Sequence, residues 1–222
     1  MSLWTDFLSN NECGLKICGV TLRKDAQMLL EENVPALGVN FWPQSKRFIS
    51  PTDASPWLKE IQGKILRVGV FVNPTHEEIA EILQQGIIDV AQLHGHESPE
   101  FMEEIRTKNF PVIKAWGVKS TDDHLGLAAY SRADAWLLDT PAPGIFGGTG
   151  EAFDWSLATS VAERYPNQPI LLAGGITAEN AAAAVQMLRP SALDVASGAE
   201  ISPGRKDRAK VRDIIQAMTK KM

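Results

Sequence analysis

A lysine and a cysteine interrupt a short apolar run near the beginning of the chain. Leu15–Val20 has the composition of a buried strand, in which side chains alternate between two faces, so Lys16 and Cys18 share one face. Gly19 ends this strand and allows another group to approach the backbone closely. Cys18 is therefore the last inward side chain before a loop, where its thiolate could act on a ligand. The alternative is a buried cysteine that behaves as a small hydrophobic residue.

An aspartate closes another apolar run, Ala135–Thr140. A buried carboxylate is costly unless it is paired or takes part in chemistry, so Asp139 is a second candidate functional group. A helix-capping aspartate is the alternative, but residues 141–150 are too rich in glycine for a helix to follow. This segment, which contains Gly147 and Gly148, predicts a mobile lid over a site or a backbone nest for an anion.

Two small glycine-containing turns follow the last two apolar runs. One contains Gly174 and Gly175, and the other contains Ser197 and Gly198. Backbone N–H groups of such turns commonly hold a phosphate after the seventh and eighth strands of a barrel. The two turns together predict a phosphate site, with glycines that serve turn geometry alone as the alternative.

Arg47 and His94 are further candidates for contact with a ligand. Arg47 lies in a loop with aromatic neighbours, and its guanidinium could form two hydrogen bonds to a carboxylate while those neighbours cover an apolar ring. A solvated basic loop is the alternative. His94 ends the run Val90–His94, and it either touches the ligand or closes a hydrogen bond in the core.

Lys16 needs a partner, because an unpaired charge inside a barrel is very costly. Asp194 lies on the last apolar run, which neighbours the first run if the barrel is closed. We expect the two side chains to form an ion pair that keeps a positive charge beneath Cys18 and favours its thiolate. Lys114 could contact the substrate or its phosphate, and the sequence does not place it.

The elements that position these residues follow a repeating pattern. Strand-like runs rich in Val, Ile, Leu and Ala alternate with helix-like stretches, without a compositional break or linker. The pattern predicts a single (β/α)8 TIM barrel over residues 1–222. An open doubly wound sheet is the alternative, but the glycine fingerprint of a dinucleotide site is missing after the first run. The predicted strands are Leu15–Val20, Ala36–Phe41, Leu66–Val72, Val90–His94, Val112–Val118, Ala135–Thr140, Ile170–Gly174 and Ala192–Ser197, and the predicted helices include Asp25–Glu31, Thr75–Gln84, Ser98–Thr107, Thr177–Leu188 and Asp207–Met218.

Composition argues against several kinds of partner. A formal net charge of −5 disfavours nucleic acid and anionic membranes as partners. No apolar run approaches the ~20 residues of a membrane span, and the polar start is unlike a signal peptide. The two cysteines, Cys13 and Cys18, do not complete a metal site, so we expect a cytoplasmic protein without a metal. The residues before Gly14 could plug the bottom of the barrel.

The motifs occur in a fixed order along nearly the whole chain. They are Lys16–Thr21, Pro43–Pro51, Val68–Asn73, Gln92–Gly95, Leu137–Thr140, Gly147–Gly150 with Phe153–Trp155, Ala173–Ile176, and Asp194–Gly198 with Ser202–Gly204. In combination they resemble the phosphoribosylanthranilate isomerases, the barrel enzymes of tryptophan biosynthesis. The chain departs from that pattern at Asn40 and Trp42, near the expected walls of the anthranilate pocket, and at Thr149, which is often serine.

The resemblance implies an Amadori rearrangement of N-(5-phosphoribosyl)anthranilate to 1-(2-carboxyphenylamino)-1-deoxyribulose 5-phosphate, with no cofactor. It assigns Asp139 as the general acid at the ribose ring oxygen and Cys18 as the base that removes the C2 proton. Arg47 would hold the anthranilate carboxylate, and the two glycine turns would hold the phosphate. The expected partner is thus a small phosphorylated substrate, with the protein a monomer or a homodimer.

Three rival functions fit these residues less well. The histidine-pathway isomerase performs the same rearrangement but is expected to use two aspartates, so Cys18 disfavours it. Indole-glycerol-phosphate synthase would need a lysine/glutamate acid–base set that these strand ends lack. A barrel that only binds a phosphorylated ligand is disfavoured because Cys18 and Asp139 are both present.

Overall fold

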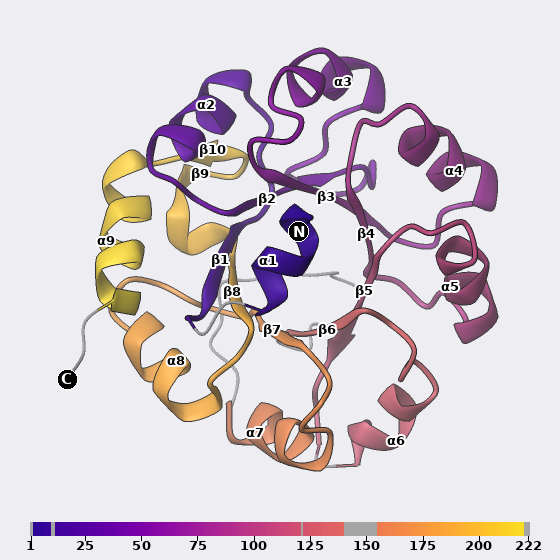
Figure 1. The fold of residues 1–222 in the computed structure, drawn as a ribbon. Helices are drawn as coiled ribbons and strands as arrows, with labels where there is room; N and C mark the ends of the chain where they lie inside the picture. Colours follow the sequence, from indigo (N-terminus) through magenta and orange to yellow (C-terminus); the bar gives the residue numbers. More distant parts are fainter. Residues whose placement is uncertain (1, 10–11, 121, 140–154, 220–222) are drawn as a thin grey trace.

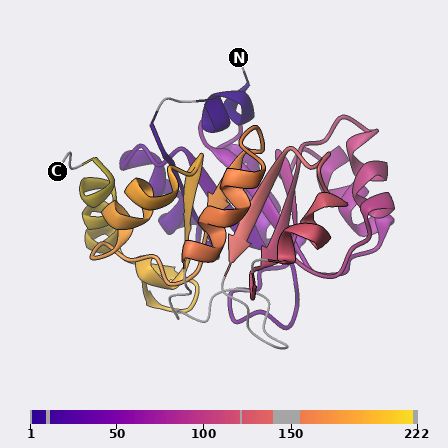
Figure 2. The same cartoon turned by 90° about the horizontal axis from the view of Figure 1, so that it is seen from below.

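Eight parallel strands close into a barrel in chain order, with β8 pairing back onto β1 (Figure 1). The computed structural model describes residues 2–9, 12–120, 122–139 and 155–219. Helices surround the strands, as the side view in Figure 2 also shows, so the predicted TIM barrel is confirmed. The strands are β1 Gly14–Ile17, β2 Ala36–Asn40, β3 Leu66–Phe71, β4 Val90–Leu93, β5 Val112–Gly117, β6 Ala135–Asp139, β7 Ile170–Leu172 and β8 Ala192–Val195, and a separate hairpin is formed by β9 Glu200–Ser202 and β10 Arg205–Lys206.

Three helices, α3, α4 and α5, begin at residues whose side chains cap them. Thr75 forms the capping box with Glu78 at the start of α4, and Ser98 caps α5, whose first residue is Pro99. The predicted start of α8 at Thr177 is wrong, because the Thr177 N–H donates to Oδ1 of Asn180 in a turn that precedes the helix. The helices are α1 Leu3–Ser9, α2 Arg23–Glu31, α3 Pro51–Glu60, α4 His76–Gln84, α5 Pro99–Arg106, α6 Asp123–Ala128, α7 Trp155–Arg164, α8 Ala181–Leu188 and α9 Arg208–Thr219, with a 3-10 turn, η1, at Ser197–Ala199.

The barrel strands start close to their predicted positions and end earlier. β1 ends at Ile17 rather than Val20, and β7 ends at Leu172 rather than Gly174. Gly19 and Gly174 have φ angles of 77° and 87°, which take the backbone out of the extended region. The residues past each strand therefore turn over the mouth of the barrel, where side chains can meet a ligand.

The core has two shells. Apolar side chains between the strands and the helices form the larger one, whereas the barrel interior is filled by small and branched residues such as Ala36, Val68 and Val90. The helix α1 packs Phe7 against this interior cluster from the amino-terminal end of the strands. The prediction that the first residues plug the bottom of the barrel is therefore confirmed for Leu3–Ser9.

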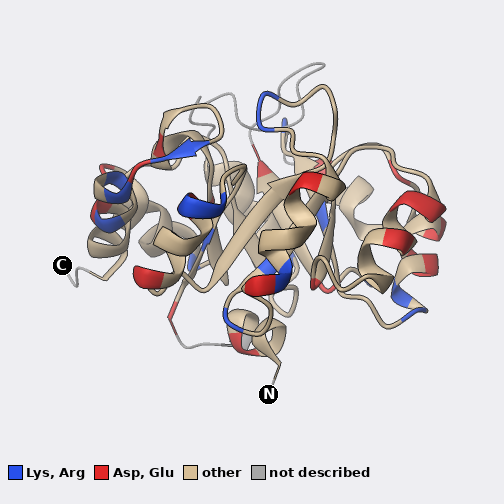
Figure 3. Ribbon diagram, turned by 90° about the horizontal axis from the view of Figure 1, so that it is seen from above, with Lys and Arg blue, Asp and Glu red and all other residues tan. Residues whose placement is uncertain are grey.

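Charged residues lie mostly on the outer helices and loops, and few lie on the barrel strands (Figure 3). Lys16, Arg67 and Lys114 are buried exceptions on strands, and each has a carboxylate partner. Within the described ranges, no helix is long and apolar enough to cross a bilayer. The same residues contain no cluster of His, Cys, Asp and Glu that could hold a metal ion.

Candidate active site

Most of the predicted site residues meet at the carboxyl end of the barrel. Gly198 does not line the pocket; it lies so close to Ile176 that a Cβ would come 2.0 Å from the carbonyl oxygen of that residue. Gly147 and Gly148 lie outside the described residues. A larger hollow of about 910 Å³ lies between α3 and α4 and reaches none of the predicted residues. The predicted residues that line the shared pocket are Cys18, Arg47, His94, Asp139, Gly174, Gly175, Asp194 and Ser197.

The predicted ion pair beneath the thiol is present. Nζ of Lys16 lies 2.7 Å from Oδ1 of Asp194, its register partner on β8, and the Lys16 side chain is fully buried. On the other side, β2 presents Gly38, where a Cβ would come 2.9 Å from Sγ of Cys18 and 3.1 Å from Nζ of Lys16. The glycine therefore gives the thiol and the ammonium room to lie side by side.

The charge of Lys16 does not bring the pKa of the Cys18 thiol below its usual value, contrary to the expectation from the sequence. Burial raises the pKa of the Cys18 thiol and the charge of Asp194 adds to it, whereas Lys16 and Lys206 lower it; the net pKa lies above the usual value. The expectation of a favoured thiolate is corrected accordingly, because burial outweighs the cation. Burial alone would lower the pKa of Lys16, but Asp194 and Cys18 reverse this, so Lys16 stays charged.

Asp139 and His94 face each other across the mouth. Nε2 of His94 lies 3.5 Å from Oδ2 of the almost buried Asp139, and Nδ1 of His94 lies 3.0 Å from Nε2 of Gln92. In this orientation of the Gln92 amide, Nδ1 accepts and Nε2 of His94 carries the proton that points at Asp139. His94 therefore lines the pocket and also forms a hydrogen bond with Gln92, so the predicted contact with the ligand stays a prediction.

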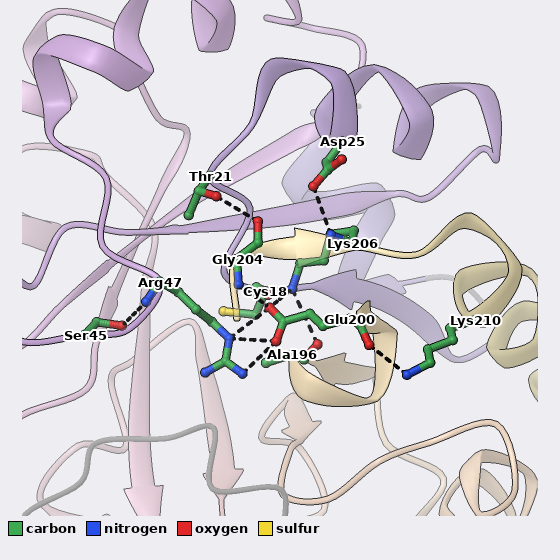
Figure 4. Close-up of polar contacts among 10 residues, drawn as sticks. All are labelled: Cys18, Thr21, Asp25, Ser45, Arg47, Ala196, Glu200, Gly204, Lys206 and Lys210. Carbon is green, nitrogen blue, oxygen red and sulfur yellow. Dashed lines mark hydrogen bonds and ion pairs between the residues drawn. The ribbon is translucent and has the colours of Figure 1, made fainter. Parts of the chain in front are cut away.

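Arg47 reaches the pocket by passing over the turn after β1. A Cβ on Gly19 would come 2.3 Å from Cδ of Arg47, so the turn admits the arginine only because the residue is glycine. Its guanidinium forms a two-pronged contact with Glu200, with Nε 2.9 Å from Oε1 and Nη2 2.7 Å from Oε2 (Figure 4). Arg47 is therefore an oriented and mostly buried group rather than part of a solvated basic loop.

Glu200 and Lys206 were missed by the sequence analysis. They lie on the β9–β10 hairpin, and the buried Nζ of Lys206 contacts Oε1 of Glu200 at 2.7 Å and donates to the carbonyl oxygen of Cys18 (Figure 4). The only signal was their position beside Ser202–Gly204, one of the motifs that carry the resemblance. Spacing alone does not reveal such a partnership, because the two residues approach β1 and the loop after β2 only in the folded barrel.

Lys114 is placed by the structure outside the pocket. Its ammonium lies 2.7 Å from Oε2 of Glu97 and 2.7 Å from the carbonyl oxygen of Gly95. Both Lys114 and Glu97 are about 1% exposed, and Lys114 also lies 5.3 Å from the ring centre of Tyr130. These contacts make Lys114 a support for the turn after β4, outside the pocket lining.

We expect Lys16→Met to lower the free energy of unfolding by about 3–5 kcal/mol, because it leaves Asp194 buried without its partner. Urea denaturation measures the change. The matched control is Arg23→Met, which breaks an ion pair with Glu60 whose side chains are 71% and 52% exposed, and should cost about 1 kcal/mol or less. Equal losses in the two variants would contradict the importance of the buried pair.

Comparisons with known proteins agree with this geometry. The sequence model of the family described as N-(5'phosphoribosyl)anthranilate (PRA) isomerase matches residues 15–217. The N-(5'-phosphoribosyl)anthranilate isomerase of Pseudomonas fluorescens is 40% identical over 204 residues, which cover 91% of this chain and 94% of that one. The crystal structure of the Thermotoga maritima phosphoribosyl anthranilate isomerase has a TM-score of 0.84 at 37% identity, covering 93% of this chain and 98% of that one. The chain belongs to the N-(5'-phosphoribosyl)anthranilate isomerase family.

Proposed function

We propose that the chain isomerises N-(5-phosphoribosyl)anthranilate to 1-(2-carboxyphenylamino)-1-deoxyribulose 5-phosphate, a step of tryptophan biosynthesis in the cytoplasm. The observation that carries the proposal is that a thiol following β1 and a carboxyl group at the end of β6 line the same pocket. Membership of the family supports the same substrate. A related isomerase, 36% identical with a TM-score of 0.81, was crystallised with the reduced form of this product.

Asp139 acts as the general acid in this reaction. Its carboxyl group donates a proton to the ribose ring oxygen while the bond from C1 to that oxygen breaks and the anilino nitrogen forms a C=N bond to C1. Nε2 of His94 lies 3.5 Å from Oδ2 of Asp139, so the imidazole is the neighbour of the acid at the mouth of the barrel. The product of this step is an open-chain iminium ion.

Cys18 acts as the general base in the next step. Its thiolate takes the proton from C2, and the electrons of the broken C–H bond form a C1=C2 bond as the C=N bond returns its pair to nitrogen. The enolamine then tautomerises, with the C2 hydroxyl losing its proton and C1 gaining one, to give the ketone. The nearby ammonium groups of Lys16 and Lys206 oppose the rise in the pKa of the thiol that burial causes.

Arg47 and the turns after β7 and β8 hold the two ends of the substrate. The anthranilate carboxylate binds the guanidinium of Arg47, which Glu200 orients, and the phosphate binds the turns that contain Gly174, Gly175 and Ser197. Gly198 lets the second turn pack closely against the carbonyl oxygen of Ile176. The two anions thereby fix the sugar between the acid and the base.

A fluorescence assay that follows the loss of the anthranilate substrate tests the function directly. Turnover by the purified chain supports the proposal, and binding of the substrate without turnover would replace it with a non-catalytic binding function. The histidine-pathway substrate serves as the comparison, and preferential turnover of that compound would overturn the assignment.

We expect Arg47→Ala to raise KM by about 10-fold to 100-fold, with a smaller effect on kcat, because charge-assisted hydrogen bonds to a carboxylate are lost. Steady-state kinetics measure both constants. Arg47→Lys is the matched control: it keeps the charge but not the planar fork, so it should recover only part of the lost affinity. An unchanged KM in the alanine variant would mean that the carboxylate is held elsewhere.

A further inference from the structure

One buried carboxylate contacts both the arginine and the lysine of the site. Oε1 of Glu200 lies 2.7 Å from Nζ of Lys206, 2.9 Å from Nε of Arg47 and 3.1 Å from the N–H of Gly204. Oε2 lies 2.7 Å from Nη2 and 3.1 Å from Nε of Arg47. Figure 4 shows both cations directed at the same carboxylate from different elements. Glu200 is thus fully engaged by donors and is itself only 4% exposed at its side chain.

Lys206 connects Glu200 to the residues that follow β1 and β8. Its ammonium donates to the carbonyl oxygen of Cys18 and lies 3.4 Å from that of Ala196, the residues that follow β1 and β8. The N–H of Lys206 donates to Oδ2 of Asp25 on α2 at 2.9 Å, which fixes the hairpin from the other side. Lys206 therefore contributes to holding the Cys18 backbone, whose N–H also donates to the carbonyl oxygen of Val195 at 2.8 Å.

The charges explain why a carboxylate is needed between the two cations. Arg47 and Lys206 are both mostly buried, and each disfavours the other when no anion lies between them. Burial opposes the ionisation of Glu200, but the contacts with Arg47 and Lys206 outweigh it and hold the pKa of that carboxyl below its usual range. Glu200 therefore stays ionised and keeps both cations in place.

We propose that Glu200 is a positioning residue that sets the substrate-binding arginine and the catalytic base relative to each other, acting on Arg47 directly and on Cys18 through Lys206. This inference rests on the proposed isomerase function. The effects of the two contacts of Glu200 are then separable. Loss of the contact with Arg47 should change KM, and loss of the contact with Lys206 should change kcat. A side chain that served only stability would not divide its effects in this way.

Double-mutant cycles on the full chain test the proposal. Glu200→Gln should raise KM about tenfold and lower kcat about tenfold, because it weakens charge-assisted hydrogen bonds to both cations. In an Arg47→Ala background, Glu200→Gln should no longer change KM but should still lower kcat. Lys206→Met should lower kcat and leave KM unchanged, and in that background Glu200→Gln should affect KM alone.

The control breaks a similar contact at the opposite end of the barrel. Asp89 accepts hydrogen bonds from Nε and Nη2 of the buried Arg67, at 3.0 and 2.6 Å. Asp89→Asn should lower the melting temperature without changing kcat or KM. Glu200→Asp, which keeps the charge on a shorter side chain, should show the same division of effects at smaller size and provides a second variant if Glu200→Gln folds poorly.

Three results would overturn the inference. Additive cycles, in which Glu200→Gln raises KM equally with and without Arg47, would show that it does not act through the arginine. Wild-type kinetics in Glu200→Gln, or the same kinetic changes in Asp89→Asn, would equally exclude a positioning role. Lack of turnover by the wild-type chain would instead refute the isomerase function, which separates the two failures.

Discussion

Cys18→Ala should lower kcat by about 10²-fold to 10⁴-fold and leave substrate affinity largely intact, because the methyl group cannot accept the C2 proton. Gly38 leaves the space in which the thiol of Cys18 and the ammonium of Lys16 lie side by side, and a methyl group would leave the rest of the pocket unchanged. Steady-state kinetics give kcat, and calorimetric titration with the reduced product gives the affinity.

Cys13→Ala is the matched control for the loss of a thiol. Cys13 is also a free cysteine, but it does not line the pocket. Burial raises the pKa of its thiol to about 12. We expect full turnover in this variant. Near-normal turnover in Cys18→Ala would remove Cys18 from the mechanism.

Asp139→Asn should cause a loss of similar size, about 10²-fold to 10⁴-fold in kcat, because the amide keeps the shape of the side chain but cannot supply the acid proton. Steady-state kinetics measure the loss, and circular dichroism checks that the variant is folded.

Asp134→Asn is the control at the opposite end of β6. Asp134 lies just before this strand, outside the pocket, and its carboxylate accepts hydrogen bonds from Nε of Arg106 and from the N–H of Val112. We expect this variant to be less stable but catalytically normal. Retained turnover in Asp139→Asn would show that another group protonates the ring oxygen.

The raised pKa of Cys18 has two opposing consequences for catalysis. It lowers the fraction of thiolate in the free protein, but a thiolate of higher pKa is the stronger base for a proton on carbon. Lys16 and Lys206 moderate the shift without removing it. The mechanism thus depends on the balance between burial and two cations, and not on a single charge beneath the thiol.

The barrel could be predicted from sequence because its strands are buried on both faces. Runs such as Leu66–Phe71 and Ala135–Asp139 are almost wholly apolar, and their starts coincide with the predicted ones. The helix α3 was not predicted, although Ser50 and Pro51 form a regular start for it. Pro56 lies inside α3, and a proline in the interior of a segment argues against a helix at the level of the sequence.

The site residues that could be predicted are those whose position follows from a single strand. Cys18, Asp139 and Asp194 follow from their places on apolar strands, since alternation decides which side chains face inward. The Arg47–Glu200 contact could not be predicted, because it joins residues 153 positions apart, one in the loop after β2 and the other in the β9–β10 hairpin. The direction of the pKa shift of Cys18 could not be predicted for a related reason. The ion pair between Lys16 and Asp194 depends on two neighbouring strands, whereas the burial of Cys18 depends on side chains from several elements.

The helix α1 and the pocket lie at opposite ends of the same strands, with Phe7 beneath the interior cluster and Cys18 above it. A tether joined ahead of Leu3 would therefore emerge from the face that the substrate does not use. For immobilisation on a surface, or for fusion to a second enzyme, attachment at this end should leave the entrance unobstructed. The helix α1 thus closes one end of the barrel and also provides a site of attachment away from the pocket.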